Sequence, residues 1–149
     1  MLGTSLRHGR AGALAAALQV SLAAGAQPAM APPAAPALAG VWRIEQARTE
    51  PIYDRALARL DFGTEGRLTG HTSCNALKAD YRLQGTRLHI GTVTTTRQRC
   101  GRQQLEQEDR ILTALELAET AQVRPDGLLE LRDAEGRGVL RATRPSAGD

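Results

Sequence analysis

Residues 56–72 read Ala56-Leu57-Ala58-Arg59-Leu60-Asp61-Phe62-Gly63-Thr64-Glu65-Gly66-Arg67-Leu68-Thr69-Gly70-His71-Thr72. Apolar side chains occupy alternate positions from Ala56 to Phe62, opposite Arg59 and Asp61. A period of two is typical of a strand with one buried face. Turn residues follow at 63–66, and the alternation then resumes. The stretch therefore predicts a β-hairpin.

The same pattern recurs on both sides of this hairpin. Residues 38–44 contain an opening strand, and residues 81–90 contain a second hairpin around Gly85-Thr86. Further strands are expected over residues 121–124, 128–132 and 139–144. Because these strands are short and separated by turn residues, we expect an antiparallel sheet.

One segment has a different period. Between residues 102 and 118 the apolar side chains are expected on one side of a helix: Leu105, Ile111, Leu112, Leu115 and Ala118. Strands, one helix and strands again are the order of an antiparallel α+β domain whose single helix covers or plugs the sheet. The pattern has no strand–helix–strand alternation, which argues against a parallel nucleotide-binding sheet.

The N-terminal residues are typical of an export signal. Arg7 and Arg10 precede an apolar run, and Ala24-Gly25-Ala26 is a small-residue cleavage site, so residues 1–26 are predicted to be a signal peptide. The apolar run is Ala-rich and shorter than the ~20 residues that a membrane anchor needs. We therefore expect cleavage, no membrane span afterwards, and a periplasmic or secreted protein.

The rest of the chain divides into three parts. Residues 27–37 are rich in Pro and Ala and predict a disordered linker. Residues 38–144 are long enough for one small domain, and residues 145–149 form a flexible tail.

The charge balance argues against a nucleic-acid partner. The sequence pI is about 9.4, with 19 basic and 16 acidic side chains. Two of the basic residues, Arg7 and Arg10, leave with the signal peptide, and the others are interspersed with acids. A nucleic-acid-binding protein needs a clustered cationic face.

Cys74 and Cys100 are the only cysteines, 26 positions apart. An exported chain folds in an oxidising compartment, where two thiols tend to form a disulfide. A loop of that size would stabilise the fold by about 3–4 kcal/mol in the chain-entropy model. A thiol-redox role for the pair is the alternative, because Arg97 and Arg99 would favour a thiolate at Cys100.

Several short motifs occur in a specific order. Leu38-Ala39-Gly40-Val41-Trp42 opens the domain, a Phe-Gly-x-x-Gly-Arg-Leu-x-Gly segment ends at Gly70, Ser73-Cys74-Asn75 follows, and Thr95-Thr96-Arg97-Gln98-Arg99-Cys100 precedes the helix that carries Glu106 and Glu108. Together they resemble the META domain, or HslJ-like, family of small exported bacterial proteins. In that family the tripeptide is usually Gly-Cys-Asn, and the later motif is Ser-Thr-Arg-Met-Ala-Cys.

The resemblance implies a fold more than an activity. It implies an antiparallel β-sheet curling around a single helix, with the two cysteines bonded. It singles out as motif residues Trp42, Gly70, Asn75, Thr96, Arg97, Glu106 and Glu108. The family's associations with envelope stress, drug tolerance, secretion and motility are loose.

The candidate chemical groups do not form a catalytic constellation. His71 lies near Cys74, but His89 is in another hairpin, so the ligands that a zinc site needs are not assembled. Glu106 and Glu108 are two positions apart on the helix and point away from each other. We therefore expect a non-enzymatic, monomeric accessory protein of the envelope or cell surface, without metal or cofactor. It would bind a protein or a small ligand.

Overall fold

The computed structural model describes residues 1, 3 and 38–146. The predicted signal peptide and linker, residues 1–37, lie outside the described residues apart from 1 and 3, as do residues 147–149 of the predicted tail. Among the described residues, no helix is long and apolar enough to cross a membrane.

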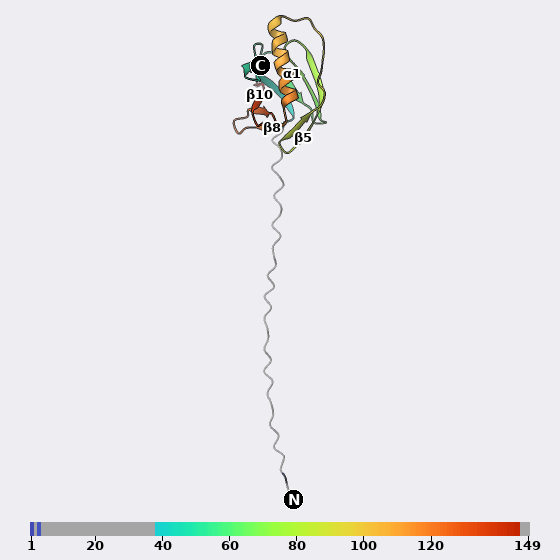
Figure 1. Cartoon of the computed structure of the whole chain (residues 1–149), viewed down its shortest axis with the longest axis vertical. Coiled ribbons are helices and arrows are strands. Elements are labelled where there is room, and N and C mark those ends of the chain that lie inside the picture. The colour runs from blue at the N-terminus through green and yellow to red at the C-terminus, as the bar shows by residue number, and fades with distance from the viewer. Residues whose placement is uncertain (2, 4–37, 147–149) are drawn as a thin grey trace. The chain divides into compact units, whose positions relative to one another are not determined.

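Figure 1 shows the strands and the single helix of the described domain. In chain order the elements are β1 (Gly40–Ala47), β2 (Glu50–Pro51), β3 (Arg59–Phe62), β4 (Arg67–His71), β5 (Ala76–Gln84), β6 (Arg87–Ile90), β7 (Thr94–Thr95), α1 (Arg102–Leu117), β8 (Thr120–Val123), β9 (Leu129–Arg132) and β10 (Gly138–Thr143). Both predicted hairpins are confirmed, since β3 pairs with β4 and β5 pairs with β6. The predicted helix and the three C-terminal strands are also present.

The sheet closes on itself. Eight strands lie side by side in the order β10-β9-β8-β6-β5-β4-β3-β1, and β1 also pairs with β10, with Arg43 opposite Thr143 and Ala47 opposite Leu140. The prediction of an antiparallel β-sheet curling around a single helix is therefore wrong. The domain is a closed eight-stranded antiparallel β-barrel with one helix. Closure pairs the two edge strands, which would otherwise expose unpaired backbone groups.

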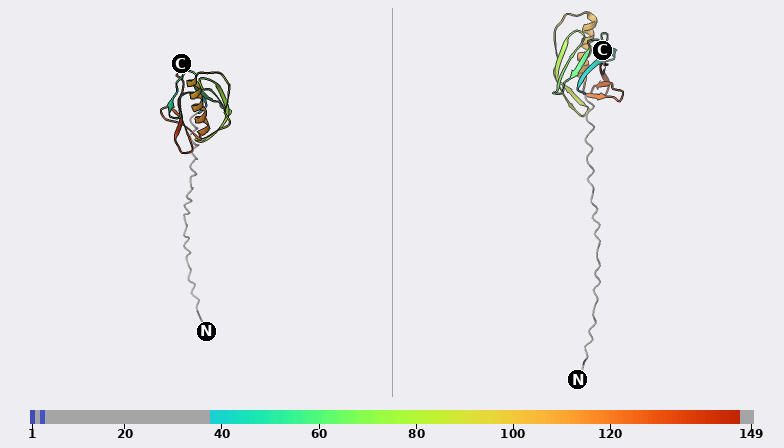
Figure 2. Two further views of the ribbon diagram at one scale, coloured as in Figure 1. Left: turned by 45° about the horizontal axis from the view of Figure 1, so that its top comes forward. Right: turned by 180° about the vertical axis from the view of Figure 1, so that it is seen from behind.

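The helix α1 packs against β10 and β1. In the views of Figures 1 and 2 it runs between the green strands around β5 and the red strands near the C-terminus. Its buried residues are Gln107, Ile111, Ala114 and Leu115. Three of them join the hydrophobic core, whose largest side chains include Trp42, Ile44, Leu60, Phe62, Leu68, Leu129 and Leu131.

The helix face was predicted incorrectly at one end. Leu105 is 45% exposed, whereas Gln107 is fully buried. Successive helical residues are about 100° apart, so Leu105 points about 200° away from Gln107 and cannot share the stripe of Gln107 and Ile111. A polar side chain thus occupies the buried face near the helix N-terminus.

Candidate functional site

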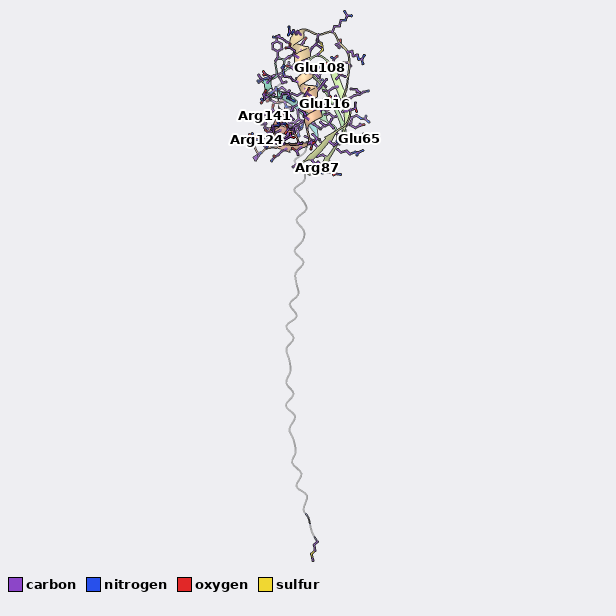
Figure 3. All side chains as sticks on the ribbon, viewed as in Figure 1. Glu65, Arg87, Glu108, Glu116, Arg124 and Arg141 are labelled. Carbon is purple, nitrogen blue, oxygen red and sulfur yellow. A yellow bond between two sulfur atoms is a disulfide. The ribbon has the colours of Figure 1, made fainter. Side chains whose placement is uncertain are left out.

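The β4–β5 turn meets a distant part of the chain, namely the loop that precedes α1 and the first half of α1 itself. We call the residues that meet there the motif cluster: Thr72, Ser73, Cys74, Asn75, Thr96, Cys100, Gln107 and Glu108. In Figure 3, Glu108 is labelled near the upper part of α1, above Glu116 on the same helix.

A disulfide joins Cys74 to Cys100, with their Cα atoms 5.9 Å apart. The pairing agrees with the sequence prediction. Cys74 is only 6% exposed, while Cys100 is half-buried. The bond ties the β4–β5 turn to the residue that lies two positions before α1.

The side chain of Asn75 connects the β4–β5 turn both to α1 and to the loop that precedes α1. Its Nδ2 donates to both carboxylate oxygens of Glu108, at 3.1 and 3.0 Å, and contacts Cys74 Sγ at 3.2 Å. Its Oδ1 accepts from Thr96 Oγ1 at 2.9 Å and from the backbone N–H of Gln98 at 2.7 Å. An Asn side chain has two donor hydrogens and two acceptor sites, so this amide is fully used.

Thr72 links the same turn to the helix. Its buried hydroxyl donates to Glu108 Oε2 at 2.6 Å and accepts from the backbone N–H groups of Asn75 and Cys74, at 2.9 and 3.3 Å. Glu108 therefore accepts hydrogen bonds from two residues of the turn. A charged acceptor makes these bonds stronger than neutral ones.

Gln107 connects a third segment. Its Nε2 donates to Thr72 O and Ser73 Oγ, both at 2.9 Å, and its Oε1 accepts from the backbone N–H groups of Tyr53 and Asp54, at 2.7 and 3.2 Å. Gln107 is not among the residues that the sequence motifs predicted. The available signal was its position, because Gln107 is four residues before Ile111 on the buried stripe, and a polar residue there needs buried partners.

Ser73 stands where the META-domain motif that this sequence resembles usually has glycine, and the backbone conformation at this position favours glycine. Its φ is 83°, in the left-handed region, which costs a non-glycine residue roughly 1–2 kcal/mol. The Ser73 hydroxyl donates to Asp54 O at 2.7 Å and accepts from Gln107. These hydrogen bonds offset part of the cost.

Four predicted motif residues lie outside the cluster. Trp42 is buried, its indole N–H donates to Leu38 O at 2.7 Å, and the guanidinium of Arg144 lies 4.0 Å from its ring centroid. Gly70 permits close pairing of β3 and β4, because a Cβ there would clash with Arg59 O. Arg97 is exposed, and Glu106 is exposed and paired with Arg102 at 2.8 Å.

The cluster holds few groups able to do chemistry. Both sulfurs are bonded, and the amides of Asn75 and Gln107 do not titrate. Near the cluster, His71 Nδ1 accepts from the backbone N–H of Ser73 at 3.0 Å. Within the described ranges, no group of three or more His, Cys, Asp or Glu side chains could hold a metal ion. The side chains of the cluster bind one another and hold the β4–β5 turn against α1.

Two buried acids lie elsewhere, on and beside β9. Burial opposes ionisation of Glu130, but hydrogen bonds and charge from Arg132 and then Arg141 outweigh it and lower its pKa. Arg137 likewise holds the pKa of Asp133 below its usual value, against the effect of burial. Acids with lowered pKa values stay ionised at neutral pH, which makes them poor general acids.

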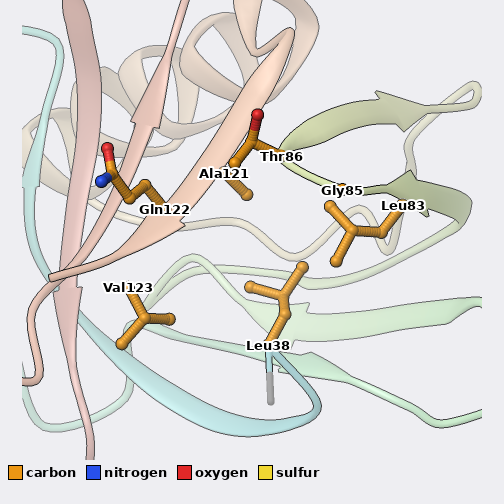
Figure 4. A pocket seen from close by; sticks show the side chains of 7 residues that line it. All are labelled: Leu38, Leu83, Gly85, Thr86, Ala121, Gln122 and Val123. Atoms are coloured by element: carbon orange, nitrogen blue, oxygen red, sulfur yellow. The ribbon is translucent and has the colours of Figure 1, made fainter. Parts of the chain in front are cut away.

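A small apolar pocket lies between Leu38, the β5–β6 hairpin and β8 (Figure 4). It has a volume of about 180 Å³ and is lined by Leu38, Leu83, Gly85, Thr86, Ala121, Gln122 and Val123. An engineered cavity of about 150 Å³ accepts benzene, whereas ordinary ligand pockets are about 300–1,000 Å³. The pocket thus has room for one small apolar group, and its lining residues carry no titratable side chain.

Comparison with known proteins gives a family and a fold. The sequence profile of the META domain matches residues 36–146. No curated protein matches the chain. An NMR structure of a protein from Burkholderia xenovorans is 24% identical, with a TM-score of 0.55 over 72% of this chain and 82% of that one. A second NMR structure is 23% identical, with a TM-score of 0.52 over 70% and 87%. At these identities the likeness shows the fold alone.

Proposed function

We propose a function from the premise that the chain belongs to the META domain family: it is an exported, non-catalytic accessory protein of the cell envelope or surface that acts by binding. META domains are not a known class of enzymes, and the Cys74–Cys100 disulfide fits a non-catalytic domain. A role in envelope stress rests on the family resemblance.

One observation carries the proposal, namely that internal bonds occupy the motif cluster. Asn75 and Gln107 use their side-chain amides fully, both cysteines are bonded, and Glu108 accepts from two partners. Buried polar groups that satisfy one another rigidify a fold. They leave little capacity for a substrate, so we assign the cluster to stability and the function to another surface.

The proposal of export draws on two features. Residues 1–26 have the basic, apolar and small-residue parts of a signal peptide in order. A structural disulfide also forms and persists outside the reducing cytoplasm.

Mass spectrometry of the alkylated protein tests export and the disulfide together. The full chain is expressed in a bacterium with a periplasm, and the periplasmic extract is treated with iodoacetamide before and after reduction. We expect a chain that begins at Gln27, with no alkylated cysteine before reduction and two after it. A chain that lacks residues 2–26 is the control and should stay in the cytoplasm.

Two results would contradict the proposal. Retention of the full-length chain in the cytoplasm would rule out export. Two cysteines that react without reduction would favour the thiol-redox alternative, in which Cys74 and Cys100 exchange electrons. The binding role has its own test, crosslinking in the intact envelope, and a consistent lack of any crosslinked partner would count against it.

A further inference from the structure

We propose that the small apolar pocket between Leu38, the β5–β6 hairpin and β8 binds a small neutral molecule, which inserts one aromatic ring or one branched alkyl group. This inference rests on the proposed binding function and names the class of ligand. The pocket has a volume of about 180 Å³. Its lining comes from three parts of the chain, namely the residue at position 38 ahead of β1, the end of β5 with the turn that follows, and β8.

The pocket lies where the barrel wall is least complete. β6 and β8 share one paired position, Arg87 with Thr120, whereas β5 with β6 and β8 with β9 each pair over four positions. Next to that position the backbone N–H of Ala121 donates to Thr86 O at 2.8 Å. The hairpin turns there, so no strand of the described domain pairs with β8 at Val123 on this side. The interior of an eight-stranded barrel is either filled by side chains or holds one small ligand, and ligands favour the mouths of barrels.

The side chains around this space are apolar. In Figure 4, Leu38 and Leu83 extend toward each other, and Ala121 and Val123 lie around the same space. Leu38 and Ala121 are buried, while Leu83 and Val123 are half-buried and pack against the hydrophobic core. The amide of Gln122 points away from both leucines in the same view. A group that enters the pocket would therefore contact hydrocarbon from three parts of the chain.

The volume and the lining together select the ligand. A cavity of about 150 Å³ accepts benzene, so a pocket of about 180 Å³ admits one ring but not a whole drug-sized molecule. Water in such a space finds few hydrogen-bonding partners, and its replacement by an apolar group is favourable. A charged group would be buried without a charged partner, because none of the lining residues is titratable. The ligand is therefore neutral.

The rim of the pocket favours a small molecule over a protein segment. Its residues Gly85, Thr86 and Gln122 are exposed and carry no large apolar side chain. A stable protein interface buries about 800 Å² on each partner around an apolar centre. None of the lining residues is among the large apolar side chains that the described domain exposes, which are Val41, Tyr53, Leu57, Leu105 and Leu117.

The experiment uses benzene as the probe. It is titrated, up to its solubility limit, into the ¹⁵N-labelled chain as purified from the expression host, and the amide resonances are followed by NMR. Methanol at equal concentrations is the control for solvent effects. We expect saturable shifts at residue 38, residues 83–86 and residues 121–123 with benzene only, and a Kd of about 1 mM or lower. We also expect nuclear Overhauser effects from benzene to the methyl groups of Leu38 and Leu83.

Matched variants test where benzene binds. Ala121→Leu fills the pocket and should weaken binding at least 10-fold. Ala76→Leu makes the same change at an exposed position at the other end of β5 and should alter binding less than 2-fold. Thermal unfolding checks that each variant is folded. Val123→Phe, which fills the pocket from a half-buried position, should weaken binding at least 5-fold and replaces Ala121→Leu if that variant does not fold.

Four results would overturn the inference. They are the lack of saturable shifts with benzene, shifts centred outside the pocket, equal binding by the filled and control variants, and nuclear Overhauser effects from the pocket methyl groups to residues 27–37 in place of benzene. The last result would assign the pocket to the chain's own segment before Leu38.

Failure of this inference differs from failure of the proposed function. If benzene does not bind while crosslinking in the envelope captures a partner, the proposed binding function stands and a different surface carries it. If crosslinking finds no partner, the proposed function loses its support. The benzene titration needs no partner and gives its result in either case.

Discussion

The motif cluster and the outer face of β1 and β3 differ in how far their polar side chains are engaged. In the cluster, buried polar side chains such as Asn75 and Gln107 are saturated with internal hydrogen bonds. On the outer face of β3, Arg59 is exposed and forms no ion pair with the other described residues. The comparison teaches that several motif residues bind one another inside the fold, whereas Arg59 is exposed and belongs to no motif.

The first way to break this contrast is to remove the disulfide. The C74S/C100S variant should lose about 3.5 kcal/mol of unfolding free energy, because the 26-residue loop is no longer closed in the unfolded chain. For a domain of this size the melting temperature should fall by about 10–20 °C. Scanning calorimetry of the variant and of the reduced wild-type protein measures the loss. A melting temperature that stays within 2 °C would refute the structural role of the bond.

The second way is to remove the buried amide of α1. Gln107→Ala should cost about 3 kcal/mol, because it leaves backbone N–H and C=O groups of the loop and turn unpaired and opens a cavity. Gln103→Ala, at an exposed position of the same helix, is the control and should change stability by less than about 0.5 kcal/mol. Urea unfolding compares them, and equal effects would show that the network adds little.

A smaller effect sharpens the contrast at Ser73. Both Ser73→Ala and Ser73→Gly lose the hydroxyl contacts, but only glycine tolerates the positive φ without strain. The glycine variant should therefore be more stable than the alanine variant by about 1 kcal/mol. At Thr64, an exposed turn residue without a positive φ, glycine should give no such advantage. An alanine variant as stable as the glycine variant at position 73 would contradict the strain argument.

Local structure was predictable because its determinants are local. The alternation around Leu60 and Leu68 predicted the first hairpin, and the helical period between residues 102 and 118 predicted α1. Closure of the barrel was not predictable. It pairs β1 with β10 across the whole domain, and the sequence pattern of neither strand indicates its pairing partner.

The residues of the motif cluster were predictable only in part. The motifs pointed to Cys74, Asn75, Thr96 and Glu108, which the structure brings together. Gln107 was missed because the predicted helix face was centred on the larger apolar residues, including Leu105. The proximity of Arg43 and Arg59 could not be foreseen, because the two residues become neighbours only through the register of β1 with β3.

Side-by-side urea unfolding of Gln107→Ala and Arg59→Gln at neutral pH tests the central claim most directly. We predict a loss of about 3 kcal/mol for the buried amide, which has four hydrogen-bonding contacts, and less than about 0.5 kcal/mol for the exposed guanidinium. Equal losses, or a larger loss for Arg59→Gln, would contradict the assignment of stability to the motif cluster.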